Sequence, residues 1–195
     1  TVCKKNNFGQ MIHQNVIWGL QQTENDDFVF RKSIEPDDVC ILVDKTFKKG
    51  QVFNNPFLCD KHAGYLLASL DLPLYVNWLG KYGDLILHAS GVVVNGVGYC
   101  FLGASGAGKS TLAAYLAQKH GLTVLGEDHI ILRCLEGNFW VFGSPWHEDP
   151  TLCAPLGVPL EKLVFIDLEA KPGIQTINRL EGVTRVLQTA FVPYY

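Results

Sequence analysis

Apolar residues come in short runs separated by polar turns, and this pattern is sharpest in the middle of the chain. Apolar runs predict strands over residues 85–94 and 98–102, joined by Asn95-Gly96, a strong signal for a two-residue hairpin. The two strands are therefore expected to pair in antiparallel fashion. After a glycine-rich segment, residues 109–120 have the pattern of a helix, and Gly121 is a residue typical of the position just after a helix end.

Downstream of this helix, short apolar runs predict further strands and one late helix. The segment Glu136-Gly137-Asn138 separates two of these runs and predicts a second hairpin. A helical pattern over about residues 181–190 lies near the end of the chain. The predicted strands in this part are 122–125, 130–135, 139–142 and 163–166.

The first part of the chain has a weaker pattern of short strands and turns. Candidate strands are 29–30, 39–43 and 52–53, and residues 60–81 have the pattern of a helix that Pro73 would split in two. We therefore expect an N-terminal, mostly β extension over residues 1–60 and a larger domain over residues 61–195. The predicted class is α/β with a mixed sheet in which antiparallel pairs predominate.

The composition indicates a folded chain with a sizeable core. Of the 195 residues, 48% are apolar and 18% are charged, and the formal net charge is 16 − 19 = −3. This charge argues against a broad surface for nucleic acid, and no apolar run is long enough to span a membrane. The six cysteines lack a C-x-x-C pair, which favours reduced thiols in the cytoplasm. The apolar ending over residues 191–195 suggests that the C-terminal region is cut short.

The glycine-rich segment carries the strongest chemical signal. Residues 103–110 match the P-loop pattern G-x-x-x-x-G-K-[ST] between a predicted strand and a predicted helix. Glycines let backbone N–H groups turn toward an anion, Lys109 can reach the β- and γ-phosphates, and the Ser110 hydroxyl can bind Mg²⁺. ATP and Mg²⁺ are therefore the expected cofactors. The expected nucleotide-binding residues are Gly103, Ala104, Ser105, Gly106, Ala107, Gly108, Lys109, Ser110 and Thr111.

A P-loop site usually has a second metal ligand, an aspartate at the end of a neighbouring apolar strand. Asp128 follows the strand directly after the predicted P-loop helix, and Asp167 follows the apolar run 163–166. A strand reached through one crossover helix usually lies near the strand that it left, which favours Asp128. Asp167 remains the alternative, and otherwise it is a solvated strand end.

His88 lies on the strand that precedes the hairpin. Pairing around Asn95-Gly96 places residue i opposite residue 191 − i, so His88 is expected opposite Gly103. An imidazole beside bound phosphates is suited to proton transfer or to contact with the γ-phosphate. The competing interpretation is a histidine that only makes hydrogen bonds within the sheet.

These residues resemble the kinase domain of HPr kinase/phosphorylase, which shares its plan with ATP-type phosphoenolpyruvate carboxykinase. The resemblance lies in residues 87–111, with Gly126-Glu127-Asp128 following, and covers about residues 63–150. It implies a P-loop nucleotide-binding domain with an antiparallel hairpin leading into the loop. It also implies that His88 and Asp128 steer and deprotonate a serine hydroxyl, that Ser110 and Asp128 hold Mg²⁺, and that Glu127 assists Asp128.

The segment that begins Gly143-Ser-Pro-Trp resembles smaller HPr-kinase-like proteins of peptide-tailoring pathways. The expected acceptor is therefore a serine of a small protein or peptide, or a small hydroxylated molecule, rather than HPr. His147, Glu148 and Arg179 are candidates for contacting this acceptor or supporting the metal ligands, although the segment could equally be a polar turn. Arg179 and Arg185 are also possible phosphate clamps from the C-terminal part of the chain, with surface charges as the competing interpretation, and His129 is expected to point away from Asp128.

The preferred function is thus an ATP-dependent kinase acting on a hydroxyl, with His88, Asp128, Lys109 and Glu127 as its catalytic residues. Two alternatives stay open, namely an ATPase or GTPase switch and a noncatalytic nucleotide-binding module that acts on a partner protein. The low charged fraction also leaves room for a homo-oligomer interface.

Overall fold

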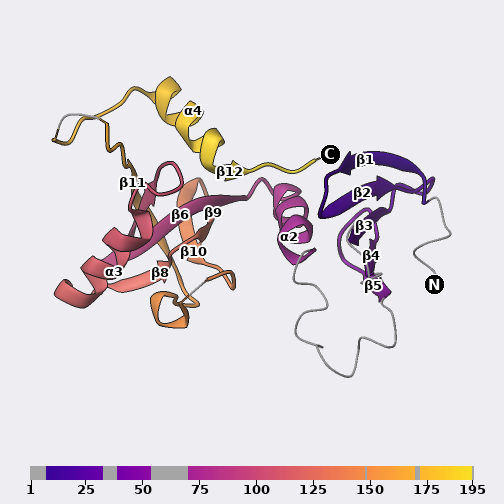
Figure 1. Cartoon of the computed structure of the whole chain (residues 1–195), viewed down its shortest axis with the longest axis horizontal. Helices are drawn as coiled ribbons and strands as arrows, with labels where there is room; N and C mark the ends of the chain where they lie inside the picture. Colours follow the sequence, from indigo (N-terminus) through magenta and orange to yellow (C-terminus); the bar gives the residue numbers. More distant parts are fainter. Residues whose placement is uncertain (1–7, 33–38, 54–69, 148, 170–171, 195) are drawn as a thin grey trace. The chain divides into compact units, whose positions relative to one another are not determined.

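The structure is a computed structural model in which the chain divides into two compact units (Figure 1). The first unit contains residues 1–78 and 193–195, and the second contains residues 79–192. The boundary expected near residue 60 falls outside the described residues. These are 8–32, 39–53, 70–147, 149–169 and 172–194.

The first unit contains a five-stranded antiparallel sheet in which each strand pairs with the next along the chain. The three strands expected in this region are confirmed as β3, β4 and β5, whereas β1 and β2 were not predicted. Both missed strands are rich in glutamine, so they lack the apolar runs that mark the other three. The strands are β1 (Gln10–Gln14), β2 (Trp18–Gln22), β3 (Phe28–Lys32), β4 (Cys40–Val43) and β5 (Gly50–Phe53).

Helix α2 (Asp71–Gly80) begins in the first unit, and its Leu74 packs against that unit's core. Residues 60–69 of the predicted helix lie outside the described residues. The helix begins at Asp71 and continues through Pro73, so no break occurs at the proline. Pro73 is the third residue of α2, where a backbone N–H has no partner within the helix, so proline is tolerated. The buried side chains of this core are Trp18, Leu20, Phe28, Phe30, Val39, Ile41, Val43 and Leu70.

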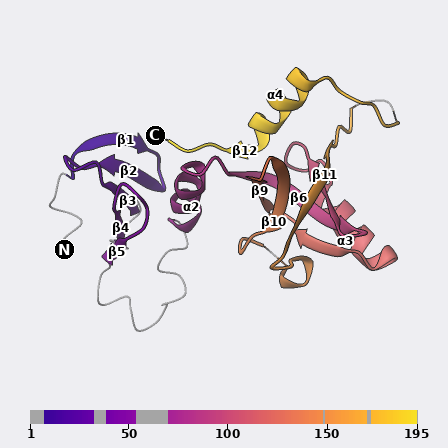
Figure 2. The ribbon, with the colours of Figure 1, turned by 180° about the vertical axis from the view of Figure 1, so that it is seen from behind.

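In the second unit, which Figures 1 and 2 show from two sides, the strand pairings join five strands in a closed ring. The pairing of β7 with β11 is parallel, and the other four pairings of the ring are antiparallel. Described residues thus form sheets and three α-helices, so the expected mixed α/β class is confirmed. In ring order, the strands are β6 (Leu85–Val94), β7 (Val97–Leu102), β11 (Gly157–Phe165), β10 (Asn138–Gly143) and β9 (His129–Leu135).

Both predicted hairpins are present in the second unit. Asn95 and Gly96 have φ angles of +50° and +82°, as a two-residue turn between β6 and β7 requires. The β6–β7 register follows the expected alignment as far as Ala89 and Leu102, where the pairing ends. His88 and Gly103, the next two residues, line the same larger cavity. The second turn is tighter than predicted, because Asn138 already pairs with Leu135 across it.

Two helices and two further strands complete the second unit. Helix α3 (Lys109–His120) has the predicted limits, and Gly121 follows it with φ +64°. Strand β8 (Thr123–Gly126) returns from α3 and pairs with β6, so β6 lies between β8 and β7. Helix α4 (Arg179–Thr189) is followed by β12 (Ala190–Phe191), which also pairs with β6.

Residues on opposite faces of β6 and β7 enter two different cores. Ala113 of α3 is buried beside Val92 and Phe101, whereas Leu87 and Leu102 lie in the core of the ring. The alternation of side chains along a strand explains this division. No helix in the described part of the chain combines the length and the apolar character needed to cross a membrane.

Candidate functional site

The glycine loop, residues Gly103–Ser110, connects the end of β7 to the start of α3. Gly106 and Gly108 have φ angles of +79° and +90°, a conformation that side chains disfavour. At Gly103 a Cβ atom would lie 2.8 Å from the carbonyl oxygen of Ile166. The start of the loop is therefore held closely against the segment that follows β11.

Lys109 is buried at the junction of the glycine loop and α3, with 5% of its surface exposed. Its Nζ donates hydrogen bonds to the carbonyl oxygens of Gly103 (3.1 Å) and Ala104 (3.0 Å), which closes the loop on itself. Burial lowers the pKa of this amine, and the negative charge of Asp128 partly opposes that effect. A lysine and a helix N-terminus beside turned backbone N–H groups form an environment that favours an anion.

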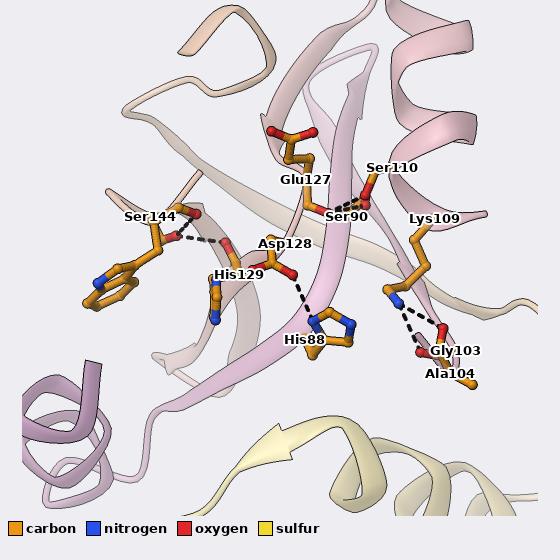
Figure 3. A network of polar contacts seen from close by, with 11 residues as sticks. His88, Ser90, Gly103, Ala104, Lys109, Ser110, Glu127, Asp128, His129 and Ser144 are labelled. Carbon is orange, nitrogen blue, oxygen red and sulfur yellow. Dashed lines mark hydrogen bonds and ion pairs between the residues drawn. The ribbon is translucent and has the colours of Figure 1, made fainter. Parts of the chain in front are cut away.

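Two serine hydroxyls fix the bend that leads to Asp128 (Figure 3). Ser90 of β6 and Ser110 of α3 both donate to the backbone carbonyl oxygen of Glu127, at 2.7 and 3.0 Å. Ser90 is fully buried. Because one carbonyl accepts from both hydroxyls, the bend is joined at the same point to β6 and to the start of α3.

The carboxylate of Asp128 lies between two imidazoles. Its Oδ1 is 2.9 Å from Nδ1 of His88, and its Oδ2 is 2.9 Å from Nδ1 of His129. The expectation that His129 points away is therefore wrong. It assumed strand alternation, but β8 ends at Gly126 and β9 begins at His129, so Asp128 lies in a bend. His88 and His129 then face each other as a pair across β6 and β9.

One cavity of about 250 Å³ brings most of the predicted residues together. Both parts of the expected metal site, Ser110 and Asp128, line it beside Lys109 and His88. The alternative carboxylate, Asp167, does not line this cavity. The lining residues are His88, Ser105, Gly106, Gly108, Lys109, Ser110, Thr111, Glu127 and Asp128.

The side chain of Glu127 makes a different contact from the one expected for an assistant of Asp128. Its Oε1 accepts a hydrogen bond from the backbone N–H of Asp149 at 2.6 Å, and the residue is buried. In Figure 3 its carboxylate points away from the pair formed by His88 and Asp128. Glu127 thus contributes its carbonyl to the bend and its carboxylate to the loop after β10.

Of the remaining predicted residues, His147 and Arg179 line neither cavity. His147 is exposed in the loop after β10, and Glu148 is outside the described residues. In the same loop, hydrogen bonds from Thr151 lower the pKa of Asp149, and His147 adds a smaller effect in the same direction. Arg179 is exposed at the first turn of α4 and lines neither cavity.

A second and larger cavity, of about 740 Å³, adjoins the same loop. It shares His88, Ser105 and Gly106 with the first cavity. Asp167 and Arg185 line it, so the segment after β11 and the end of α4 belong to the site. The acidic strand end was visible in the sequence, and Arg185 was a candidate phosphate contact, but no sequence signal located α4 beside the loop. Further lining residues are Gly103, Ala104, Ala107, Phe165, Ile166, Leu168, Glu169, Gln188, Thr189, Ala190 and Phe191.

The donor set can be tested against the cofactors that the motif implies. Within the described residues, no three His, Cys, Asp or Glu side chains form a metal-binding group. Mg²⁺ in phosphate sites usually takes one or two protein oxygens, with phosphate and water oxygens as the rest. The Ser110 hydroxyl and the Asp128 carboxylate, which line one cavity, fit this requirement. The open backbone at Gly106 and Gly108 likewise fits a phosphate chain.

Comparison with protein-family models, curated proteins and solved structures gave no match to this chain.

Proposed function

We propose that this chain is an ATP-dependent kinase that transfers the γ-phosphate to a hydroxyl, with a serine of a small protein or peptide as the acceptor. The observation that carries the proposal is the His88–Asp128 pair in the same cavity as Lys109 and Ser110. A phosphate-binding loop alone serves many reactions. A paired acid–base group beside it is what phosphoryl transfer to a hydroxyl requires. In this proposal the second unit is a P-loop domain of the HPr-kinase type.

The glycine loop and Lys109 would hold the phosphates. We expect the Lys109 amine to exchange the carbonyl oxygens of Gly103 and Ala104 for phosphate oxygens, which compensates its buried charge better. Ser110 and Asp128 would hold Mg²⁺, whose chemistry when bound is to neutralise charge that develops on the phosphate oxygens. The carbonyl of Glu127 would hold these two ligands close together, because Ser110 donates a hydrogen bond to it and Asp128 is the next residue in the chain.

His88 is placed to handle the proton of the acceptor. It lines both cavities together with residues of the glycine loop, so a hydroxyl bound in the larger cavity would lie beside both the imidazole and the loop. As the hydroxyl oxygen forms its bond to the γ-phosphorus, the bond from that phosphorus to the leaving oxygen of ADP breaks. The hydroxyl proton passes to the His88–Asp128 pair, where the carboxylate stabilises the imidazolium.

The cytoplasm is the compartment that we assign to this kinase. The four cysteines within the described residues, Cys40, Cys100, Cys134 and Cys153, are free thiols. Free thiols are the usual state in a reducing compartment, where ATP is also abundant.

The proposal is tested with γ-labelled ATP, Mg²⁺ and a seryl peptide, using the wild type and Asp128→Asn. The matched acceptor control is the same peptide with alanine in place of serine. We expect label on the seryl peptide only, and a loss of about 10²-fold or more in Asp128→Asn.

Two results would contradict the proposal. Phosphate released to water at a rate that ignores the acceptor would favour an ATPase switch. ATP binding without any turnover would favour a noncatalytic module that acts on a partner protein.

A further inference from the structure

One wall of the larger cavity differs in electrostatic character from the smaller cavity. The smaller cavity contains Lys109 and the N-terminus of α3, which favour negative charge. The larger cavity is lined on one side by residues 103–107 of the glycine loop, and it also contains Asp167 and Glu169, two exposed residues of the segment after β11. The two cavities share His88, Ser105 and Gly106, so one site presents a phosphate-favouring side along the glycine loop and an acidic side at Asp167 and Glu169.

Helix α4 adds to the acidic side. Its last residues, Gln188 and Thr189, line the larger cavity, and the C-terminal end of a helix carries partial negative charge. Arg185 is the one cation among the lining residues, but its guanidinium lies 2.8 Å from the carboxylate of Glu181. It also lies over the ring of Phe165. The charge of Arg185 is thus compensated within the protein, and the carboxylates of Asp167 and Glu169 dominate the wall.

A triphosphate chain would be repelled by this wall, whereas a cationic group would be attracted to it. The size of the cavity, about 740 Å³, is in the range of sites that hold drug-sized ligands or several side chains of a peptide. Its position also suits an acceptor, because anything bound there reaches the glycine loop beside His88.

We propose that the larger cavity is the acceptor site, and that it selects a hydroxyl carried next to a cationic group, as in a seryl peptide with lysine or arginine beside the serine. This assignment rests on the proposed kinase function and names its substrate class. Asp167 and Glu169 are specificity residues in it. They contact the cationic flank and take no part in the transfer of the phosphoryl group.

The test uses the full chain with two seryl peptides of equal length, one with lysines and one with glutamates beside the serine. The variant is the double substitution Asp167→Asn with Glu169→Gln. Asparagine keeps an oxygen that can accept the backbone N–H of Glu169, so the local turn is preserved. The control is Glu161→Gln, an exposed carboxylate on β11 that lines neither cavity.

We expect the wild type and the control to prefer the basic peptide in kcat/KM. The double variant should lose about three- to tenfold with the basic peptide, mainly through KM, because exposed charge pairs contribute modestly. Its KM for ATP and its rate with the acidic peptide should not fall. Equal rates with both peptides in the wild type would overturn the acceptor assignment while leaving the kinase function intact. A raised KM for ATP in the double variant would instead assign the cavity to the nucleotide.

A binding measurement separates this inference from the proposed function. Fluorescence polarisation of the labelled basic peptide reports on the cavity without any transfer of phosphate. Binding that weakens in the double variant, but not in Glu161→Gln, would support the basic-acceptor site even if no peptide were phosphorylated. Binding of the basic peptide that is no tighter than that of the acidic one would overturn it.

Discussion

Nδ1 of His88 lies 2.9 Å from Oδ1 of Asp128. This contact joins the middle of β6 to the bend after β8. Both side chains are about one-third exposed, so the pair is accessible from the cavities and is not buried in the core. Asp128 is also held from its other side by His129. The orientation of the pair is thus set by three elements, β6, the bend and β9. Such fixed geometry is what acid–base catalysis needs.

The serines that share the Glu127 carbonyl should differ in their effect on stability. Ser90→Ala removes a fully buried hydrogen bond, and we expect a loss of about 1 kcal/mol in the free energy of unfolding of the second unit. Ser110→Ala should cost less, because Ser110 is exposed and water can replace its hydroxyl at the carbonyl. Denaturant unfolding of both variants measures the difference. Equal losses would show that the carbonyl is not held mainly from β6.

Gly143 is predicted to tolerate no side chain. A Cβ atom there would lie 2.1 Å from the carbonyl oxygen of Ala154 and 2.5 Å from that of Leu125. We expect Gly143→Ala to lower the stability of the second unit by about 1–3 kcal/mol, because backbone would have to move. The matched control is Gly182→Ala in α4, where the nearest atom is 3.8 Å away. This change should raise stability by up to about 1 kcal/mol, since alanine favours helix. Thermal unfolding of the two variants tests both signs.

Cys100 should be the least reactive of the described thiols. Burial in the core of the ring raises its pKa from 9.0 to about 12. The folded state therefore holds this proton more tightly than the unfolded state, and the resulting stability is lost as the pH rises from about 9 toward 12. At pH 9, iodoacetamide should modify exposed Cys134 and leave Cys100 unmodified until the chain unfolds. Peptide mass spectrometry distinguishes the two sites, and early labelling of Cys100 would contradict the burial described here.

Local signals in the sequence carried most of what could be predicted of the fold. The hairpin at Asn95-Gly96 and the limits of α3 were predictable because turn residues and a helix-ending glycine act within a few residues. The closure of the ring could not be predicted, because the parallel pairing of β11 with β7 joins segments far apart in the sequence. No short pattern encodes that contact.

For the candidate site too, local patterns could be predicted and contacts between distant segments could not. The glycine loop, His88 and Asp128 were predictable from one motif, one hairpin register and one crossover helix. The contact of His129 was missed because the rule of alternating side chains fails where a strand ends in a bend. The sequence offered Arg185 as a possible phosphate contact but could not locate α4, because β12, which follows it, pairs with β6 over two residues without any sequence signature.

The most direct test of the central claim compares ATP binding with phosphoryl transfer in His88→Ala. Because His88 handles the acceptor proton in this account, the variant should bind ATP as the wild type does and lose about 10²- to 10⁴-fold in transfer to a seryl peptide. Circular dichroism of the variant checks that it is folded. Folded His88→Ala that phosphorylates the peptide at the wild-type rate would contradict the account.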